Sequence, residues 1–497
     1  MSTLIQPPPP GYRKWWWIPA AIVVIVLAVG AAIWVPPLFR DCRGDGIDQS
    51  GQGNECVGVT DGSSSFNSGI DEIEKIQQSI LAENRAVEAG DAPYVSVVLL
   101  TPMTVGDNGE GIGTISGIRH RLEGAHLAQL AANKHDYWGG NPKVRLLLAN
   151  PGSDFGEWKT AVEKIEEKRK DDKIVAVTGI SFSVEEAFAA IDRLHELGMP
   201  VIGSTLTTGD DRPKEGGFLQ ISPPATEHGQ ATAEFLNKSE DRILIVRDDN
   251  PRDRYGSSLA EGFEAAIEDR ERFLPTEHYD SEYEDLPNTF GLLVDGICQN
   301  PPDTIYFAGR ADDALPFLTQ LTQRDSVCRE TPIRVFTGDD MPYWPLTEDL
   351  IQGAQDSKVS VHYTGLVHQD VWQQHPDWFH RESLAMFTDD CAPEEVCYRN
   401  FSSDPPNDFA AAMEYDAVVT AVKAIRLGNT ATDTDVTSEM VWQKFNRLHG
   451  VYGFCGASGK LDFDPAANGL PVHKPILVLK APNAELEYVK GGEDSRC

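Results

Sequence analysis

The strongest hydrophobic pattern in the chain is a continuous apolar run near its N-terminus. Residues 15–35 contain no charged side chain. A helix of this length rises about 31 Å, which matches the hydrocarbon core of a bilayer. Arg13 and Lys14 precede the run and place the N-terminus in the cytoplasm. The pattern predicts a transmembrane signal-anchor helix at 15–35 after a cytoplasmic stub at 1–14, with a cleaved signal peptide as the alternative.

The next segment changes from a polar pattern to a one-sided helical pattern. Residues 40–69 are rich in Gly, Ser and Asp, which is typical of a linker or a small stapled loop. From Ile70 to Val87 the apolar residues recur at helical spacing on one face. We therefore expect residues 36–92 to form an extracytoplasmic linker with a spacer helix.

From residue 93 onward, short apolar runs alternate with longer amphipathic segments. The run at 94–100 is almost entirely apolar, as in a parallel strand that is buried on both faces. Further strands are predicted at 144–149, 174–177, 200–202, 218–221, 243–246, 304–307 and 333–336. Helices are predicted at 115–134, 155–170, 184–197, 226–236, 257–266, 288–298, 314–323, 408–427 and 437–448.

This alternation predicts an α/β protein with parallel sheets that are covered on both faces. About nine strands exceed one comfortable sheet, so we predict two doubly wound lobes. Lobe 1 is expected to contain residues 93–222 and about 354–450. Lobe 2 is expected to contain residues 223–353 and about 451–490.

The composition is that of a globular protein with an unusual charge. Hydrophobic residues make up 41% of the 497 residues, which excludes full-length disorder and a multi-span membrane protein. The formal net charge is −34, from 77 acidic and 43 basic residues. Because such a surface repels phosphate backbones, we expect no nucleic-acid partner.

All eight cysteines follow the apolar run. An even number of cysteines outside the cytoplasm indicates disulfide bonds, although eight cysteines allow many pairings. Pairing those nearest in sequence gives Cys42–Cys56, Cys298–Cys328 and Cys391–Cys397, and leaves Cys455–Cys497. Because the chain has no CxxC motif, the sequence gives no support for a zinc site.

The sequence offers no recognisable catalytic or metal-binding motif. There is no nucleophile elbow, zinc-protease motif or P-loop. His368, His375 and His380 are spaced so that they do not share one helical face. We therefore predict no enzyme activity, no metal and no cofactor. The acidic and aromatic segment 369–401 is predicted to be an insertion, either a stapled exposed flap or a partner surface.

Six short motifs occur in a familiar order. They are VVLLTPMT (97–104), GISFSVEEA (179–187), PVIGSTLTTGD (200–210), RYGSSLAEGF (254–263), EYDAVVTAVKAI (414–425) and GASGKLDFDPAANG (456–469). In this order they resemble the type I periplasmic binding proteins, the leucine/isoleucine/valine-binding family of ABC-transporter receptors. The resemblance covers about residues 93–490. It implies two lobes that are joined by a three-strand hinge and close on a small ligand, at the carboxyl ends of the strands.

Four hydroxyl residues of lobe 1 are candidate ligand residues. Ser181 and Ser183 follow a predicted strand and precede a helix, where hydroxyl and N–H groups bind a carboxylate well. A simple helix N-cap is the alternative. Thr205 and Thr207 lie in the loop after the next strand. By resemblance, Thr207 matches a threonine that holds the amino-acid part of the ligand, and a polar loop is the alternative.

Four candidates lie in lobe 2. By resemblance, Tyr255 matches a cleft tyrosine, and Asp339 or Asp340 matches a carboxylate that meets a ligand amine. Arg310 lies where the family often has an aromatic residue. Arginine suits an anionic group through paired hydrogen bonds; an Arg310–Asp340 ion pair is the alternative. An acidic or polar amino acid, or another small carboxylate, is therefore as good an expectation as leucine.

These features together favour an extracytoplasmic solute-binding protein that delivers its ligand to an ABC permease. It would lie at the cell membrane as a single-pass protein with its C-terminal domain outside. A sensory ectodomain that signals through a partner is the alternative, and a secreted α/β enzyme is a third, less favoured one.

Overall fold

The structure is a computed structural model, and it describes most of the chain after the predicted anchor. The described residues are 42, 44–49, 55–66, 70–104, 114–207, 209, 216–251, 253–282, 285–343, 346–388, 392, 395–402, 409–427 and 436–497. The predicted stub and anchor helix lie outside them. Among the helices that are described, none combines the length and the apolar character that a membrane span requires.

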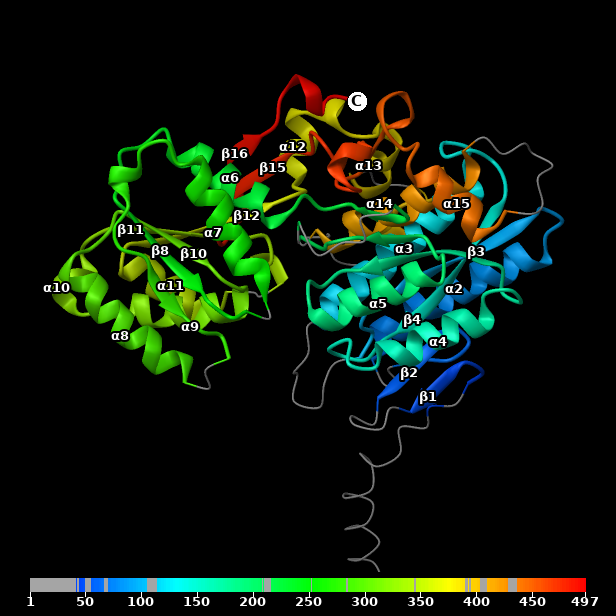
Figure 1. Ribbon diagram of the computed structural model, residues 1–497, viewed down its shortest axis with the longest axis horizontal. Coiled ribbons are helices and arrows are strands. Elements are labelled where there is room, and N and C mark those ends of the chain that lie inside the picture. Colours follow the sequence, from blue (N-terminus) through cyan, green and yellow to red (C-terminus); the bar gives the residue numbers. More distant parts are fainter. Residues whose placement is uncertain are drawn as a thin grey trace, which may run out of the picture. The chain divides into compact units, whose positions relative to one another are not determined.

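Two seven-stranded sheets form the framework of the described chain (Figure 1). The first has the order β1 (Ile47–Gln49), β2 (Cys56–Thr60), β4 (Lys143–Asn150), β3 (Tyr94–Leu100), β5 (Ile174–Ile180), β6 (Val201–Gly203) and β7 (Phe218–Gln220). The second has the order β16 (Glu485–Lys490), β15 (Ile476–Lys480), β12 (Val359–Gly365), β11 (Ile333–Thr337), β10 (Thr304–Ala308), β8 (Ile243–Asp248) and β9 (Glu277–Tyr279).

The central strands of both sheets are parallel, as their apolar runs predict. Strands β3, β4, β5, β6 and β7 run in one direction, and so do β8 to β12 in the second sheet. Residues 97–100 of β3 have no exposed surface, because helices cover both faces of the sheet. The predicted fold class, two doubly wound α/β lobes, is confirmed.

Each sheet has its own set of helices. Those of lobe 1 are α2 (Asp71–Ala89), α3 (Ile115–Lys134), α4 (Trp158–Lys168), α5 (Glu185–Glu196), α12 (Gln369–Gln374), α13 (Arg381–Thr388), α14 (Ala410–Arg426) and α15 (Ser438–Phe445). Those of lobe 2 are α6 (Ala225–Leu236), α7 (Arg254–Ala266), α8 (Leu286–Gln299), α9 (Ala311–Thr322), α10 (Ser326–Arg329) and α11 (Glu348–Asp356). Helices α3 and α14 cross so closely that a Cβ on Gly124 would lie 2.0 Å from the Ala411 carbonyl oxygen.

The chain passes between the two sheets three times, after β7, after β12 and before β15. Strand β12 belongs to the second sheet, although the sequence boundary of about 354 assigned it to lobe 1. The hairpin of β13 (Phe454–Gly456) and β14 (Gly459–Leu461) was assigned to lobe 2, but the backbone amides that follow β13 donate to Asp416 of α14. An apolar run predicts a strand without showing which sheet it joins.

The predicted linker is part of lobe 1. Strand β2 pairs with β4, so β1 and β2 extend the first sheet. Helix α2 buries Ile73, Ile76 and Ile80, and its Asn84 side chain bonds both the N–H and the carbonyl of Leu146 at 2.9 and 2.8 Å. Strand β1 lies at the edge of the sheet and the buried β2 lies beside it. Both are short and stand in a Gly- and Ser-rich segment, so their hydrophobic signal was weak.

The described part of segment 369–401 is packed against lobe 1 and is not an exposed flap. Trp372, Trp378, Phe387 and Tyr398 are each at most 7% exposed. The Trp372 indole N–H donates to the Ala457 carbonyl at 2.9 Å. The aromatic residues that made the segment look like a partner surface are therefore core residues.

Two of the predicted disulfides are confirmed. Cys298–Cys328 links the end of α8 to α10, and Cys455–Cys497 links β13 to the C-terminus. Cys42, Cys56 and Cys397 are also disulfide-bonded, and Cys391 lies outside the described residues. The C-terminal residues rest on lobe 1, since the Cys497 N–H donates to the Asp377 carbonyl at 2.8 Å and Arg496 pairs with the Asp377 carboxylate at 3.2 Å.

Candidate functional site

The eight candidate ligand residues lie at the carboxyl ends of parallel strands. Ser181 and Ser183 follow β5, and Thr205 and Thr207 follow β6. In lobe 2, Tyr255 begins α7 after β8, Arg310 follows β10, and Asp339 and Asp340 follow β11. This is the edge at which open parallel sheets bind ligands.

In lobe 1 the candidate residues are hydrogen-bonded to one another's backbone groups and to Thr101. Ser181 Oγ shares a hydrogen bond of 3.1 Å with Thr101 Oγ1, and Thr205 Oγ1 donates to the Ser181 carbonyl at 2.8 Å. The Thr207 N–H donates to Ser183 Oγ at 3.3 Å. The two loops of this lobe are therefore held together by their own polar groups.

The two serines do not cap the following helix. The N-cap of α5 is Val184, and no side chain accepts a hydrogen bond there. The N-cap alternative for Ser181 and Ser183 is therefore wrong. Their hydroxyl groups instead join the loop after β5 to neighbouring strand ends.

A buried arginine and a buried glutamate lie behind these loops. The Arg121 guanidinium of α3 lies 4.7 Å from the ring centre of Phe182, between the two serines. Glu414 of α14 is fully buried, and burial raises its pKa to about 7, partly offset by Ser204 and by the charge of Arg121. Neither Glu414 carboxylate oxygen has a hydrogen-bond partner among the described residues. The sequence analysis missed these residues.

In lobe 2 the Tyr255 hydroxyl connects the two candidate aspartates. It donates to Asp339 Oδ1 at 2.9 Å, lies 3.3 Å from Asp340 Oδ1, and accepts the Asp339 N–H at 2.9 Å. Burial and the two carboxylates raise the pKa of Tyr255 well above its usual value. The chain needs a glycine at 338, because a Cβ there would lie 1.9 Å from the tyrosine oxygen.

Arg310 is bound to Asp253. Its Nε and Nη2 donate to the two Asp253 oxygens at 2.5 and 2.8 Å, and its guanidinium lies 4.3 Å from the Tyr255 ring centre. The predicted alternative partner, Asp340, instead accepts the Ala311 N–H at 3.0 Å. Asp253 caps α7 by accepting the Tyr255 N–H, so one carboxylate positions both the tyrosine and the arginine.

The carboxylates of this half have unusual pKa values. Burial and the neighbouring Asp339 raise the pKa of Asp340 to about 7, against the opposing charge of Arg310. Burial and the charges of Asp312 and Asp248 raise the pKa of Asp313 to about 8. Burial also acts on Asp253, but Arg310 outweighs it and lowers the pKa of that carboxyl. The strand ends of lobe 2 therefore gather more acidic groups than Arg310 alone balances.

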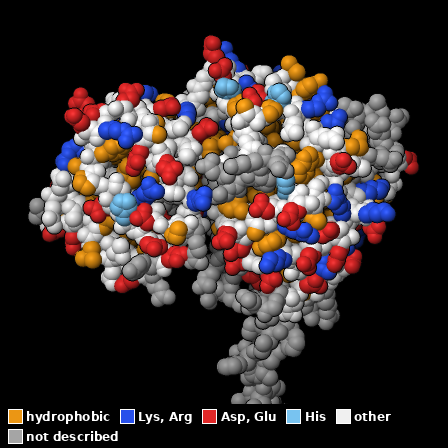
Figure 2. All heavy atoms as spheres, in the orientation of Figure 1, with side chains coloured by type: hydrophobic (Ala, Val, Ile, Leu, Met, Phe, Trp, Pro, Cys, Tyr) orange, Lys and Arg blue, Asp and Glu red, His pale blue; other side chains and the backbone are white. Residues whose placement is uncertain are grey.

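The two halves contact each other where Arg310 Nη2 lies 3.4 Å from the Ser183 carbonyl oxygen. Within the described ranges, no group of three or more His, Cys, Asp or Glu side chains could hold a metal ion. Elsewhere on the visible face, acidic side chains are spread over the surface with Lys and Arg between them and form no single patch (Figure 2). The clustering of carboxylates at the strand ends of lobe 2 therefore differs from the mixed charges on the visible surface.

Many solved structures are similar to this chain. LivK, a leucine-binding protein from Thermotoga maritima, has a TM-score of 0.59 and 19% identity, and the match covers 80% of this chain and 99% of LivK. LivJ from Streptococcus pneumoniae, a branched-chain amino acid transporter substrate-binding protein solved with isoleucine, has a TM-score of 0.58 and 15% identity over 80% and 99%. A solute-binding protein of an ABC transporter from Rhodopseudomonas palustris, solved with 3,4-dihydroxybenzoic acid, has a TM-score of 0.55 and 16% identity over 81% and 98%.

The chain has the type I periplasmic binding protein fold. No family profile and no curated protein matches the sequence. The three chain crossings agree with the three-strand hinge that this fold implies. At such low identity the likeness concerns the fold, and ligand chemistry has to come from the residues themselves.

Within this fold, the sequence analysis found most of the strand-end residues but missed their supporting groups. Asp253 had a local signal, because an aspartate before a helix is a typical N-cap. His228 and Asp313 had none. His228 Nδ1 is 2.9 Å from Thr364 Oγ1 and its Nε2 is 4.0 Å from Asp339 Oδ2, while Asp313 accepts the Tyr279 hydroxyl at 3.2 Å. These contacts join segments that are far apart in the chain.

Proposed function

We propose that this protein is an extracytoplasmic solute-binding protein that closes on a small amino-acid-like ligand and delivers it to an ABC permease. In this proposal the apolar run at 15–35 anchors the protein in the membrane with the described lobes outside. The fold supports the proposal, since the similar structures named above are binding proteins. The observation that carries it is the contact between the strand-end loops of the two lobes, in which Arg310 Nη2 lies 3.4 Å from the Ser183 carbonyl oxygen.

The site chemistry favours a ligand with an amine. Asp340 keeps a high pKa because it is buried beside Asp339, and a ligand ammonium group would offset that repulsion. Arg310 is already bound by Asp253 through two hydrogen bonds. It therefore orients Tyr255 and does not serve as an open receptor for an anionic ligand.

The lobe 1 half would receive the other end of the ligand. Its hydroxyl groups and loop N–H groups can reorient toward a carboxylate when the lobes close, since each is held by a single neutral hydrogen bond. A zwitterionic amino acid meets both demands, with its ammonium at Asp340 and its carboxylate between Ser183 and Thr207.

A thermal-shift screen of the full chain tests this function. The panel should include leucine, isoleucine, valine, lysine, glutamate and 3,4-dihydroxybenzoate. A ligand at 100 times its dissociation constant stabilises the folded state by about 2.7 kcal/mol, which raises the unfolding temperature by several degrees. We expect a zwitterionic or cationic amino acid to give this shift, and Asp340→Asn to abolish it.

The control is Asp349→Asn, on the exposed side of α11. It removes one carboxylate far from the strand ends and should leave the shift unchanged. If no compound shifts the unfolding temperature of folded protein, ligand binding at this site is not supported.

A further inference from the structure

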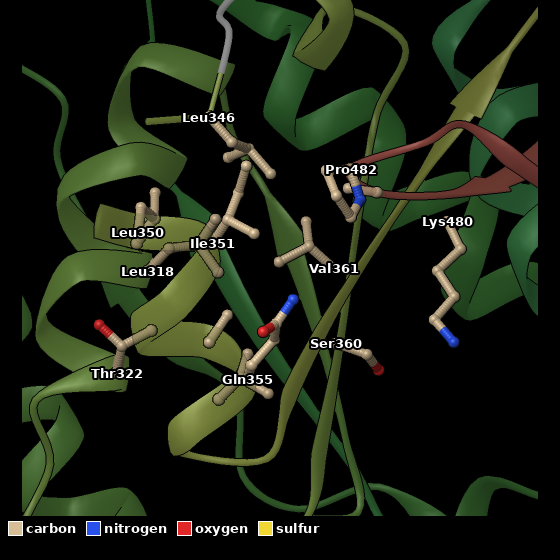
Figure 3. A pocket seen from close by; sticks show the side chains of 13 residues that line it. Leu318, Thr322, Leu346, Leu350, Ile351, Gln355, Ser360, Val361, Lys480 and Pro482 are labelled. Atoms are coloured by element: carbon tan, nitrogen blue, oxygen red, sulfur yellow. The ribbon is translucent and has the colours of Figure 1, made fainter. Parts of the chain in front are cut away.

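A cavity lies in lobe 2, away from the strand ends described above. It has a volume of about 200 Å³ and lies between α9, α11, β12 and the turn that joins β15 to β16 (Figure 3). The residues Val359 and Val361 that border it are at the amino end of β12, whereas the candidate ligand residues follow the carboxyl ends of the parallel strands. The cavity is therefore at the opposite edge of the same sheet.

Helix α11 explains why the cavity exists. Leu350 and Ile351 face the sheet, as Figure 3 shows, yet no residue of α11 is buried. An amphipathic helix normally buries its apolar face against the sheet that it covers. Here Leu350 and Ile351 border an unfilled space instead, opposite Val361 of β12.

The cavity wall is apolar. Leu318, Leu346, Leu350, Ile351, Val359 and Val361 supply most of it. Thr322 Oγ1 donates to the Thr319 carbonyl at 2.9 Å, and Ser360 Oγ lies 2.9 Å from His362 Nε2. The Lys480 ammonium points away from the apolar side chains, while the Gln355 amide points into the space between Ile351 and Val361 (Figure 3).

We propose that this cavity binds a small uncharged aromatic molecule, of the size range from benzene to indole, that carries one hydrogen-bonding group. The size follows from the volume, because a dry apolar cavity of about 150 Å³ in another protein holds benzene. The ligand is uncharged because the wall is mainly apolar and the Lys480 ammonium, although it borders the cavity, points away from it (Figure 3). The cavity opens to solvent beside Gln355, which is exposed. Its one polar group meets the Gln355 amide. This site is independent of the proposed solute-binding function.

Indole is the probe, with benzoate as a charged counterpart of similar size. In a thermal-shift titration of the full chain, indole at ten times its dissociation constant should raise the unfolding temperature by about 3 °C. Benzoate should give no shift. A crystal structure with indole should show it between α11 and β12. The absence of an indole shift, or an equal shift with benzoate, would overturn the proposal.

Ala354→Met locates the site, since residue 354 lines the cavity on the inner side of α11. A methionine there should fill the space, remove the indole shift, and raise the unfolding temperature of the free protein by about 1–2 °C. Gln352→Met, on the exposed side of the same helix, should keep the indole shift. If Ala354→Met keeps the indole shift, or lowers the unfolding temperature by several degrees, the cavity is not the binding site.

Discussion

In lobe 1 the candidate ligand residues are neutral and bind one another, whereas in lobe 2 they are charged and share few donors. Ser181, Ser183, Thr205 and Thr207 each have a partner within two neighbouring loops. In lobe 2, Asp339 and Asp340 both accept from one tyrosine hydroxyl, and the one arginine is bound to Asp253. Two lobes whose parallel strands follow the same order thus prepare their strand ends in different ways.

The chemical difference between the two halves indicates that each contributes differently to ligand binding. A hydroxyl-lined half can bind a carboxylate or a neutral group with little electrostatic preference, because its groups carry no net charge. A half with clustered carboxylates distinguishes ligands by charge, because each added positive charge relieves repulsion. In a two-lobe receptor of this kind, lobe 2 would set which ligands are accepted and lobe 1 would position them.

The pH dependence of stability should give the largest contrast. Asp313 has a pKa raised from 3.8 to about 8 in the folded state, so its contribution to stability is complete below about pH 4 and is lost as the pH rises through about 8. Between pH 5 and 8, this one group lowers the free energy of unfolding by roughly 3 kcal/mol. Urea unfolding of wild type and Asp313→Asn at several pH values measures the difference.

The asparagine can still accept the Tyr279 hydroxyl, so the variant keeps that contact and removes only the titration. Relative to Asp313→Asn, wild type should become steadily less stable as the pH rises. Asp349→Asn, on the solvent side of α11, should follow the wild-type curve. If the free energy of unfolding changes with pH in the same way for wild type and Asp313→Asn, the charge of Asp313 does not destabilise lobe 2.

Removing Arg310 should have the next largest effect on the free energy of unfolding. Arg310→Met leaves the half-buried Asp253 without its cation. Breaking a fully buried pair costs about 3–5 kcal/mol, but these side chains are 24% and 22% exposed, so we expect a loss of about 2 kcal/mol in chemical unfolding.

Adding Asp253→Asn to Arg310→Met should recover about 1 kcal/mol of that loss, because the orphaned charge is then gone. Arg334→Met is the matched control, since Arg334 pairs with Asp241 at the other edge of the sheet at similar exposure. Asp241 retains the Thr304 hydroxyl as a donor, so this control should lose less. Equal losses in the two variants would contradict a special role for the Asp253–Arg310 pair.

The smallest effect is expected in lobe 1. Ser183→Ala removes the acceptor of one neutral hydrogen bond, from the Thr207 N–H, and should cost about 0.5–1 kcal/mol in the absence of ligand. It should also reduce the ligand-dependent thermal shift. A loss of stability as large as that of Arg310→Met would remove the contrast between the two halves.

The sequence was most informative where burial is continuous. The apolar runs at 94–100 and 174–177 and the helical periodicity at 115–134 predicted β3, β5 and α3, because parallel strands and packed helices need those patterns. It failed for β1 and β2, which are short strands inside a Gly- and Ser-rich segment and join the sheet by backbone pairing. It also failed for segment 369–401, because charge at its exposed positions hid the aromatic residues that pack inward.

The candidate site was also predictable only in part. Order along the chain was enough to place Ser183, Tyr255, Arg310 and Asp340 at strand ends, since topology brings such ends to one edge. Which aspartate binds Arg310 was not predictable. Asp253 and Asp340 are both within reach of that strand end, and the choice depends on the side-chain direction at the start of α7.

The Cys455–Cys497 bond has a consequence for how the two lobes can be separated. After β16 the chain leaves the second sheet, and the disulfide fastens its end to β13 in lobe 1. A protease that cut all three crossing segments would still leave β15 and β16 covalently attached to lobe 1. Among the described connections between the lobes, three are peptide segments. The fourth is this disulfide, which a thiol reductant breaks. Limited proteolysis at all three segments should therefore leave the β15–β16 fragment linked to lobe 1 on a non-reducing gel and release it only when the sample is reduced.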